Sequence, residues 1–185
     1  LVANKINKIT VIDVDKLDSI SGRFDWIFSC YTETSRGYKI SIEKLKLKAE
    51  ELKSKIMLDA TASIGLEVNH HYADVIGYSS CKGLFGLTGA AFVAYNDPPQ
   101  NDVNSFYMNL KTHIEKKMTG PYHAICSLFE TIKSHEKFKY SVIKNKEKFL
   151  NKFKSFISVP NENQPLICTY STCGINSKKD KAVLY

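Results

Sequence analysis

The stretch that decides the fold is ADVIGYSSCKGLFGLTG, residues 73–89. It begins as an apolar run that is typical of a buried strand, and Lys82 then stands at the head of a glycine-bearing turn. A solvated surface lysine needs no such surroundings, although an ordinary exposed turn lysine is the alternative interpretation. A lysine that acts as a covalent nucleophile needs a fixed backbone and nearby hydroxyl groups. Lys82 is therefore a candidate functional residue.

Short apolar runs alternate with a helical pattern on both sides of this stretch. Strands are predicted over 9–14, 26–31, 55–59, 73–79 and 89–96, and a helix over 41–54. From about residue 103 the pattern becomes helical, with three helices reaching to about 157, and 164–173 predicts one further strand. The alternation is typical of an α/β protein with a mostly parallel sheet flanked by helices.

A lone carboxylate follows one of these strands. Parallel strands present functional side chains at their C-terminal ends, and loops with hydroxyl residues and glycine leave three such ends, over 32–37, 59–65 and 79–83. Asp59 comes directly at the end of an apolar strand, where a buried acid is costly unless a cation meets it. The alternative is that Asp59 caps a turn together with Ser63.

Composition limits the function classes. The 185 residues carry a net charge of +7, but only two of the 26 basic residues are arginines, Arg23 and Arg36. Nucleic-acid readers rely on arginine and clustered aromatic residues, so we interpret the charge as solvated helix faces and expect no nucleic-acid partner. No apolar run is long enough for a membrane span and no secretory signal is seen, which favours a cytoplasmic protein. The five cysteines show no paired spacing and are expected to be free thiols.

Other chemistries are weaker. The sequence has no GxGxxG and no GxxxxGK[ST] motif, so a phosphate-bearing cofactor needs other donors. His70 and His71 are adjacent and have no partner at ligand spacing, so no metal site is predicted. Cys81 beside a lysine could be a nucleophile, but the sequence places no histidine next to it.

Taken in order, the motifs TETSRG, DATASIG and SSCKGLFG resemble those of the class V aminotransferases of the pyridoxal-phosphate (PLP) fold type I superfamily. The likeness is nearest to the alanine–glyoxylate, serine–pyruvate and 2-aminoethylphosphonate–pyruvate transaminases and runs from about residue 5 to about residue 170. It implies that 1–136 form part of the PLP-binding large domain and that 137–185 begin a small C-terminal α+β domain.

The resemblance also implies roles for individual residues. Lys82 is expected to hold PLP as a Schiff base and to move the substrate proton, and Asp59 to keep the pyridine nitrogen protonated. Arg36 is expected to bind the anionic end of the substrate. The remaining expected cofactor contacts are Thr34 at the ring hydroxyl, Thr61 at the ring face, Ser80 and Cys81 at the phosphate, and Thr119 at the phosphate of a neighbouring subunit.

The sequence departs from the family pattern in several places. Cys81 stands where the family has Gln, Asn or His, the interval from Asp59 to Lys82 is shorter, and Arg36 replaces a small hydroxyl residue. The glycine-rich phosphate turn, the stacking aromatic residue and the C-terminal substrate arginine of the family are not found. We therefore expect a central-to-C-terminal piece of a longer enzyme.

The predicted function is transfer of an amino group between a small amino donor, either an amino acid or an aminoalkylphosphonate, and a 2-oxo acid such as pyruvate. A homodimer with shared active sites is implied by the resemblance. The alternative is a catalytically inactive piece that keeps the fold as a dimerisation or partner-binding module. A lyase or desulfurase on the same fold is a third option, although a desulfurase is expected to have histidine before the lysine.

Overall fold

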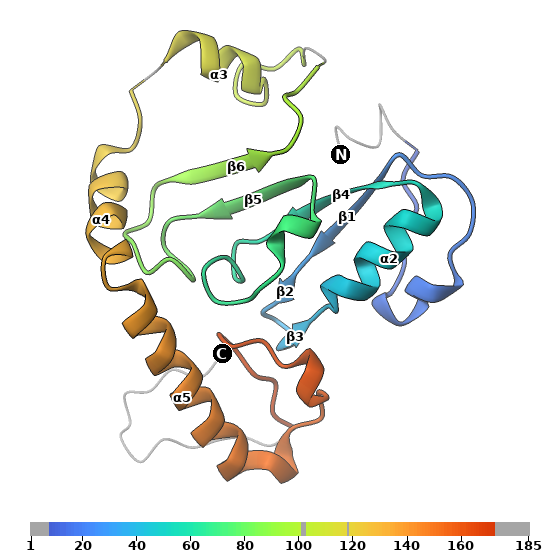
Figure 1. Cartoon of the computed structure of the whole chain (residues 1–185), viewed down its shortest axis with the longest axis vertical. Helices are drawn as coiled ribbons and strands as arrows, with labels where there is room; N and C mark the ends of the chain where they lie inside the picture. Colours follow the sequence, from blue (N-terminus) through green and yellow to red (C-terminus); the bar gives the residue numbers. More distant parts are fainter. Residues whose placement is uncertain (1–7, 101–102, 118, 173–185) are drawn as a thin grey trace.

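A computed structural model describes residues 8–100, 103–117 and 119–172. Its centre is a four-stranded sheet in the order β1-β4-β5-β6, seen in Figure 1. The strands are β1 (Trp26–Cys30), β4 (Lys55–Asp59), β5 (Val75–Ser79) and β6 (Ala91–Tyr95). β4 pairs in parallel with β1 and β5, while β6 runs antiparallel to β5 at the edge. The predicted α/β class and four of the predicted strands are therefore confirmed.

One face of the sheet carries the core. Ile56 and Leu58 point from β4 toward helix α2 (Ile42–Leu52) and pack with Leu45 in a cluster of buried side chains. The Ser41 side chain caps α2 by accepting a hydrogen bond from the backbone N–H of Lys44, 3.3 Å away. This confirms the helix predicted over 41–54, and η1 (Val14–Ser19) adds Leu17 to the same core.

The strand predicted over 9–14 is wrong. Residues 8–13 form no regular element, and Val14 already begins η1. Val11 is 89% exposed, because this stretch has no strand beside it among the described residues. Alternating apolar residues form a strand only where a neighbouring strand takes up their backbone hydrogen bonds.

The strand predicted over 164–173 is also wrong within the described residues, and Cys173 lies outside them. Ser171 forms only an isolated bridge with Ile157. Side chains occupy the backbone groups that a strand would use: Leu166 N–H donates to Glu67 and the Cys168 carbonyl accepts from Lys146. Proline at 165 removes another donor.

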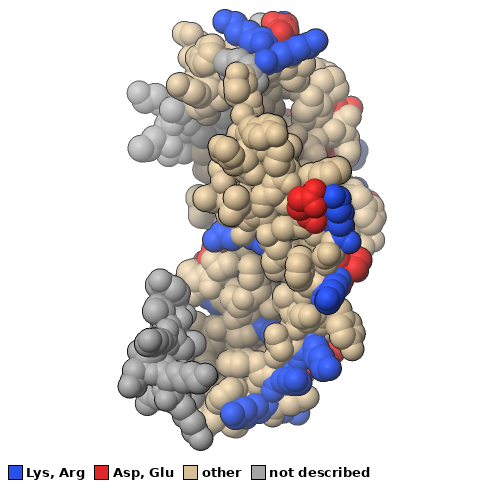
Figure 2. All heavy atoms as spheres, turned by 90° about the vertical axis from the view of Figure 1, so that its left-hand side faces the viewer, with Lys and Arg blue, Asp and Glu red and all other residues tan. Residues whose placement is uncertain are grey.

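The second half of the described chain contains the three predicted helices, which are shorter than the predicted ranges. α3 (Leu110–Lys116), α4 (Tyr122–Ile132) and α5 (His135–Phe153) follow one another along one edge of the molecule (Figure 1). Figure 2 faces this edge and shows basic side chains at its two ends, with a smaller group of basic and acidic side chains at mid-height. No helix in the described ranges is long and apolar enough to cross a bilayer.

The last described segment lies against a short two-stranded hairpin. A short hairpin of β2 (Thr32–Glu33) and β3 (Tyr38–Lys39) follows β1, and short 3-10 helices lie at η2 (His70–Tyr72), η3 (Lys154–Phe156) and η4 (Asn161–Asn163). Asn163 donates from Nδ2 to the Lys39 carbonyl at 2.9 Å. Glu67 pairs with the Lys39 amine at 2.9 Å and also accepts the backbone N–H of Leu166. The segment around Asn163 and Leu166 is thereby held against the hairpin. The division at residue 137 stays a prediction.

Candidate functional site

The sheet face opposite α2 is open among the described residues. Side chains alternate along a strand, so Trp26, Phe28 and Met57 lie on the face away from the core. Phe28 is 70% exposed and Met57 37% exposed, whereas Leu58 beside it is fully buried. The same alternation places Asp59 at the C-terminal end of this open face.

Asp59 has one carboxylate oxygen in use. Its Oδ1 accepts the backbone N–H of Thr61 at 2.9 Å, while Oδ2 has no hydrogen-bond partner among the described residues. Residues 60–66 form turns rather than a helix. The alternative prediction, that Asp59 caps a turn, is therefore met only by its hydrogen bond with Thr61. Ser63 does not take part in it, since its hydroxyl lies 2.9 Å from His70 Nε2 and 3.3 Å from the Ala60 carbonyl.

Asp59 has a thiol for a neighbour. Cys30 pairs with Asp59 in the register of β1 and β4 and lies on the same face. Burial, and after it the negative charges of Asp59 and Glu33, raise the pKa of Cys30 to about 11. The thiol therefore stays neutral at physiological pH. No cation stands against Asp59 from β1.

The lysine turn follows β5 and is held by its own backbone. Phe85 N–H donates to the Lys82 carbonyl at 2.9 Å, and Gly86 N–H donates to the Ser80 carbonyl at 2.8 Å. Phe85 adopts a left-handed conformation with φ of 60°, which a non-glycine residue takes only in a tightly determined turn. The Lys82 side chain is exposed, and its amine makes no hydrogen bond or ion pair to the described part of the chain. The backbone is thus fixed and the amine is accessible.

The two loops that carry Asp59 and Lys82 touch each other. A Cβ placed on Gly83 would lie 2.1 Å from the Ile64 carbonyl oxygen, so only glycine permits this approach. His135, the first residue of α5, lies 2.8 Å from the Gly83 carbonyl through Nε2. Sequence reasoning missed His135, because 121–138 had the pattern of one uninterrupted helix. The helix ends at Ile132, and no local pattern names the partner of His135.

Two residues predicted at the phosphate, Ser80 and Cys81, directly precede Lys82. Ser80 is fully buried and its hydroxyl donates to the Leu87 carbonyl at 2.6 Å, so that hydroxyl is taken up within the turn. Cys81 lies with its sulfur 3.7 Å from the Ser79 hydroxyl, and this hydrogen bond lowers the pKa of Cys81. A role for either residue at a phosphate stays a prediction.

The other predicted residues lie in loops. Thr61 lies beside Asp59 and is half-buried, whereas Thr34 and Arg36 are exposed in the turn between β2 and β3. The C-terminal segment packs on this turn, since a Cβ on Gly37 would lie 2.3 Å from the Tyr170 nitrogen. Thr119 is exposed just before α4. Asp59 and Thr61 lie in one loop, and this loop contacts the Lys82 turn where Ile64 meets Gly83.

These residues fit the pyridine ring of PLP. An accessible amine and a carboxylate oxygen without a partner are the groups that the aldehyde and the pyridine nitrogen require. The buried hydroxyl of Thr32, two residues before Thr34, has no hydrogen-bond partner among the described residues. The phosphate end is less well provided, because the Ser80 hydroxyl is already bonded.

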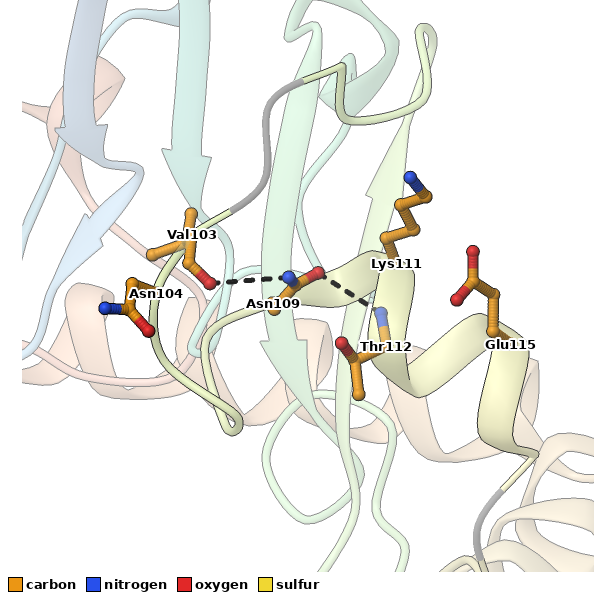
Figure 3. A pocket seen from close by; sticks show the side chains of 6 residues that line it. All are labelled: Val103, Asn104, Asn109, Lys111, Thr112 and Glu115. Carbon is orange, nitrogen blue, oxygen red and sulfur yellow. Dashed lines mark hydrogen bonds between the residues drawn. The ribbon is translucent and has the colours of Figure 1, made fainter.

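Two cavities lie elsewhere. One of about 490 Å³ lies beside the start of α3 (Figure 3). Asn109 there caps α3 by accepting the Thr112 N–H, and it also donates to the Val103 carbonyl. A second cavity of about 550 Å³ opens on the open face near Trp26 and Tyr95. Neither is lined by Asp59 or Lys82, so neither is the candidate site.

Comparison with solved structures gives the fold. The alanine–glyoxylate aminotransferase of Nostoc sp. superposes with a TM-score of 0.64 at 16% identity, over 83% of this chain and 47% of that enzyme. The chain has the fold of the aminotransferases. The ureidoglycine–glyoxylate aminotransferase of Bacillus subtilis gives a TM-score of 0.59 at 13% identity, over 82% of this chain and 45% of that one.

A neighbour from another reaction class shares the fold. The cysteine desulfurase of Thermococcus onnurineus gives a TM-score of 0.57 at 16% identity, over 84% of this chain and 46% of that enzyme. The chain thus spans about half the length of the structures it matches. No protein-family model matches the sequence, and no curated protein is similar to it. The PLP fold type I architecture expected from the motifs is confirmed, and it covers only part of that fold.

Proposed function

We propose that this chain belongs to a PLP-dependent aminotransferase that transfers an amino group between a small amino donor and a 2-oxo acid such as pyruvate. The observation that carries the proposal is the contact between the Asp59 loop and the Lys82 turn on a fold shared with aminotransferases. A free carboxylate oxygen and an accessible amine thereby come from adjacent strands of one sheet.

Each side chain has a definite task in this proposal. PLP, when bound, supplies an electron sink for the electron pair that remains on the α-carbon of the donor when its proton is removed. Asp59 holds a proton on the pyridine nitrogen through its unpartnered Oδ2. The Lys82 amine would hold the cofactor through its aldehyde carbon, and the same amine would move the proton at the donor α-carbon.

The remaining contacts are proposed with their roles unchanged. Thr34, Thr61, Ser80 and Cys81 are proposed to line the cofactor pocket. The Ser80 hydroxyl donates to the Leu87 carbonyl and the Ser80 N–H donates to the Ala90 carbonyl. Arg36 is exposed in the turn between β2 and β3 and is proposed to bind the anionic end of the substrate. Thr119 is proposed to reach the phosphate of a second subunit in a homodimer.

The experiment measures amino transfer from amino acids or 2-aminoethylphosphonate to pyruvate by the full-length native protein supplied with PLP. We expect turnover that is lost in Lys82→Ala and unchanged in Lys44→Ala, since Lys44 is an exposed lysine on the far side of α2. Equal turnover in the two variants would overturn the proposed role of Lys82. Arg36→Ala is expected to raise the Michaelis constant of the anionic substrate, and an unchanged constant would remove Arg36 from the site.

A second candidate is a catalytically inactive piece that serves as a dimerisation or partner-binding module. It is favoured by the open apolar face and by the coverage of about half of each matching structure. Measurement of the intact mass of the native gene product separates the two candidates. A native product of only this length that binds no PLP supports the module, whereas a product of about twice this length that binds PLP supports the enzyme.

A further inference from the structure

His135 is the residue through which α5 contacts both loops of the candidate site. Its side chain is 12% exposed, and Nε2 lies 2.8 Å from the Gly83 carbonyl oxygen. Nε2 also lies 2.7 Å from the position that a Cβ on Gly65 would occupy. The imidazole therefore sits where the Asp59 loop, the Lys82 turn and the first turn of α5 meet.

The hydrogen bond to Gly83 has one direction. A carbonyl oxygen can only accept, so Nε2 must carry the proton and donate it. Gly83 is buried, and its carbonyl belongs to the residue directly after Lys82. A buried carbonyl that loses its donor is left unsatisfied, which weakens the conformation that exposes it.

Packing fixes the imidazole in place. The Phe85 ring lies 5.4 Å from the His135 ring, and the Phe138 ring lies 5.7 Å from that of Phe85. Phe85 is the residue of the lysine turn with the left-handed backbone, so its aromatic contacts and the His135 hydrogen bond hold the same turn.

We propose that His135 is a positioning residue that fixes the Lys82 turn against the Asp59 loop, so that the amine and the carboxylate keep their relative placement. This inference rests on the proposed function of Lys82. His135 itself touches neither reacting group. Because it begins α5, a displacement of α5 is passed directly to the backbone next to Lys82.

The test compares two replacements in the full-length protein. His135→Leu keeps an apolar side chain beside Phe85 and removes the donor, whereas His135→Gln keeps a donor near the position of Nε2. His123→Leu is the control, since His123 is exposed on α4. Two quantities are measured: hydrogen exchange of peptide 82–87 without PLP, and the rate at which added PLP becomes reducibly attached to Lys82, trapped with borohydride and mapped by mass.

We expect His135→Leu to speed exchange of this peptide and to slow attachment by on the order of tenfold, the equivalent of one lost hydrogen bond. His135→Gln should restore most of both, and His123→Leu should change neither. Equal behaviour of the wild type and His135→Leu, or of His135→Leu and His135→Gln, would overturn the inference. If wild-type Lys82 takes up no PLP, the proposed function fails. The hydrogen-exchange measurement then still tests whether His135 holds the Lys82 turn in place.

Discussion

The two faces of the sheet differ in almost every respect. On one face, Ile56 and Leu58 are buried under α2 and pack with Leu45. On the other face, Phe28 and Met57 are exposed, and Asp59 stands at the end of the strand with a free carboxylate oxygen. Neighbouring residues of one strand, Leu58 and Asp59, therefore serve different purposes.

The difference shows how stability and chemistry are divided in this chain. Parallel strands are ordinarily covered on both faces, and here only the face that carries the folding core is covered among the described residues. The candidate reactive groups lie at the C-terminal end of the other face and in the turn that follows β5. The chain spans about half the length of the structures that it matches.

The largest expected effect contrasts adjacent residues of β4. Leu58→Ala should lower the free energy of unfolding of the 185-residue chain by about 2–5 kcal/mol, because a fully buried side chain leaves a cavity. Met57→Ala, on the open face, should change it by no more than about 0.5 kcal/mol. Urea unfolding followed by circular dichroism measures both. Similar losses for the two variants would mean that the open face is already covered in this chain, for example by a second copy.

A smaller effect is expected from two glycines. Gly83→Ala should destabilise the chain by about 1–3 kcal/mol, since the new methyl group meets the Ile64 carbonyl oxygen and the turn must move. Gly77→Ala is the matched control on β5, because a Cβ there meets nothing within 4 Å. It should be neutral or slightly stabilising in this chain. The same unfolding measurement applies, and a neutral Gly83→Ala would show that the two loops are not in contact.

The smallest expected effect is a pH dependence of the free energy of unfolding that comes from His70, which contacts Ser63 in the Asp59 loop. Burial lowers the pKa of His70 below its usual 6.5, and the Lys139 and His71 charges act in the same direction against that of Glu67. The unfolded chain therefore binds this proton more strongly than the folded one. The contribution of His70 is complete above pH 6.5 and is lost as the pH falls through the folded pKa.

His70→Gln should remove this acid-side loss, and the exposed neighbour His71 provides the control substitution His71→Gln. The quantity to compare is the free energy of unfolding between pH 5 and pH 8, taken as wild type minus variant. A difference that does not change with pH would contradict a lowered pKa for the half-buried His70.

Much of this arrangement is predictable from the sequence where local pattern and tertiary pairing agree. The runs that became β1, β4, β5 and β6 have neighbours that complete their hydrogen bonds. Residues 9–14 and 164–172 have the same apolar character, but no strand lies beside them in the described part of the chain. Pro165 and the side chains of Glu67 and Lys146 decide the second case. Such long-range contacts leave no local trace in the sequence.

The candidate site was predictable to a similar degree. Asp59 and Lys82 stand out because an acid and a lysine end adjacent apolar strands, and the chain order of the motifs adds the interpretation as a PLP site. His135 does not stand out, because its role depends on a break in a helical pattern and on the Gly83 carbonyl, 52 residues away. The roles of Thr34, Thr119 and Arg36 stay predictions, since all three are exposed in the described structure.

The central claim is that Lys82 carries the cofactor. The most direct measurement is the visible absorbance of the full-length protein with PLP, followed by borohydride reduction and peptide mapping. The account predicts a long-wavelength band that disappears on reduction and a single pyridoxyl modification on Lys82, absent in Lys82→Ala. No such band, or a band that persists unchanged in Lys82→Ala with the modification on another lysine, would contradict it.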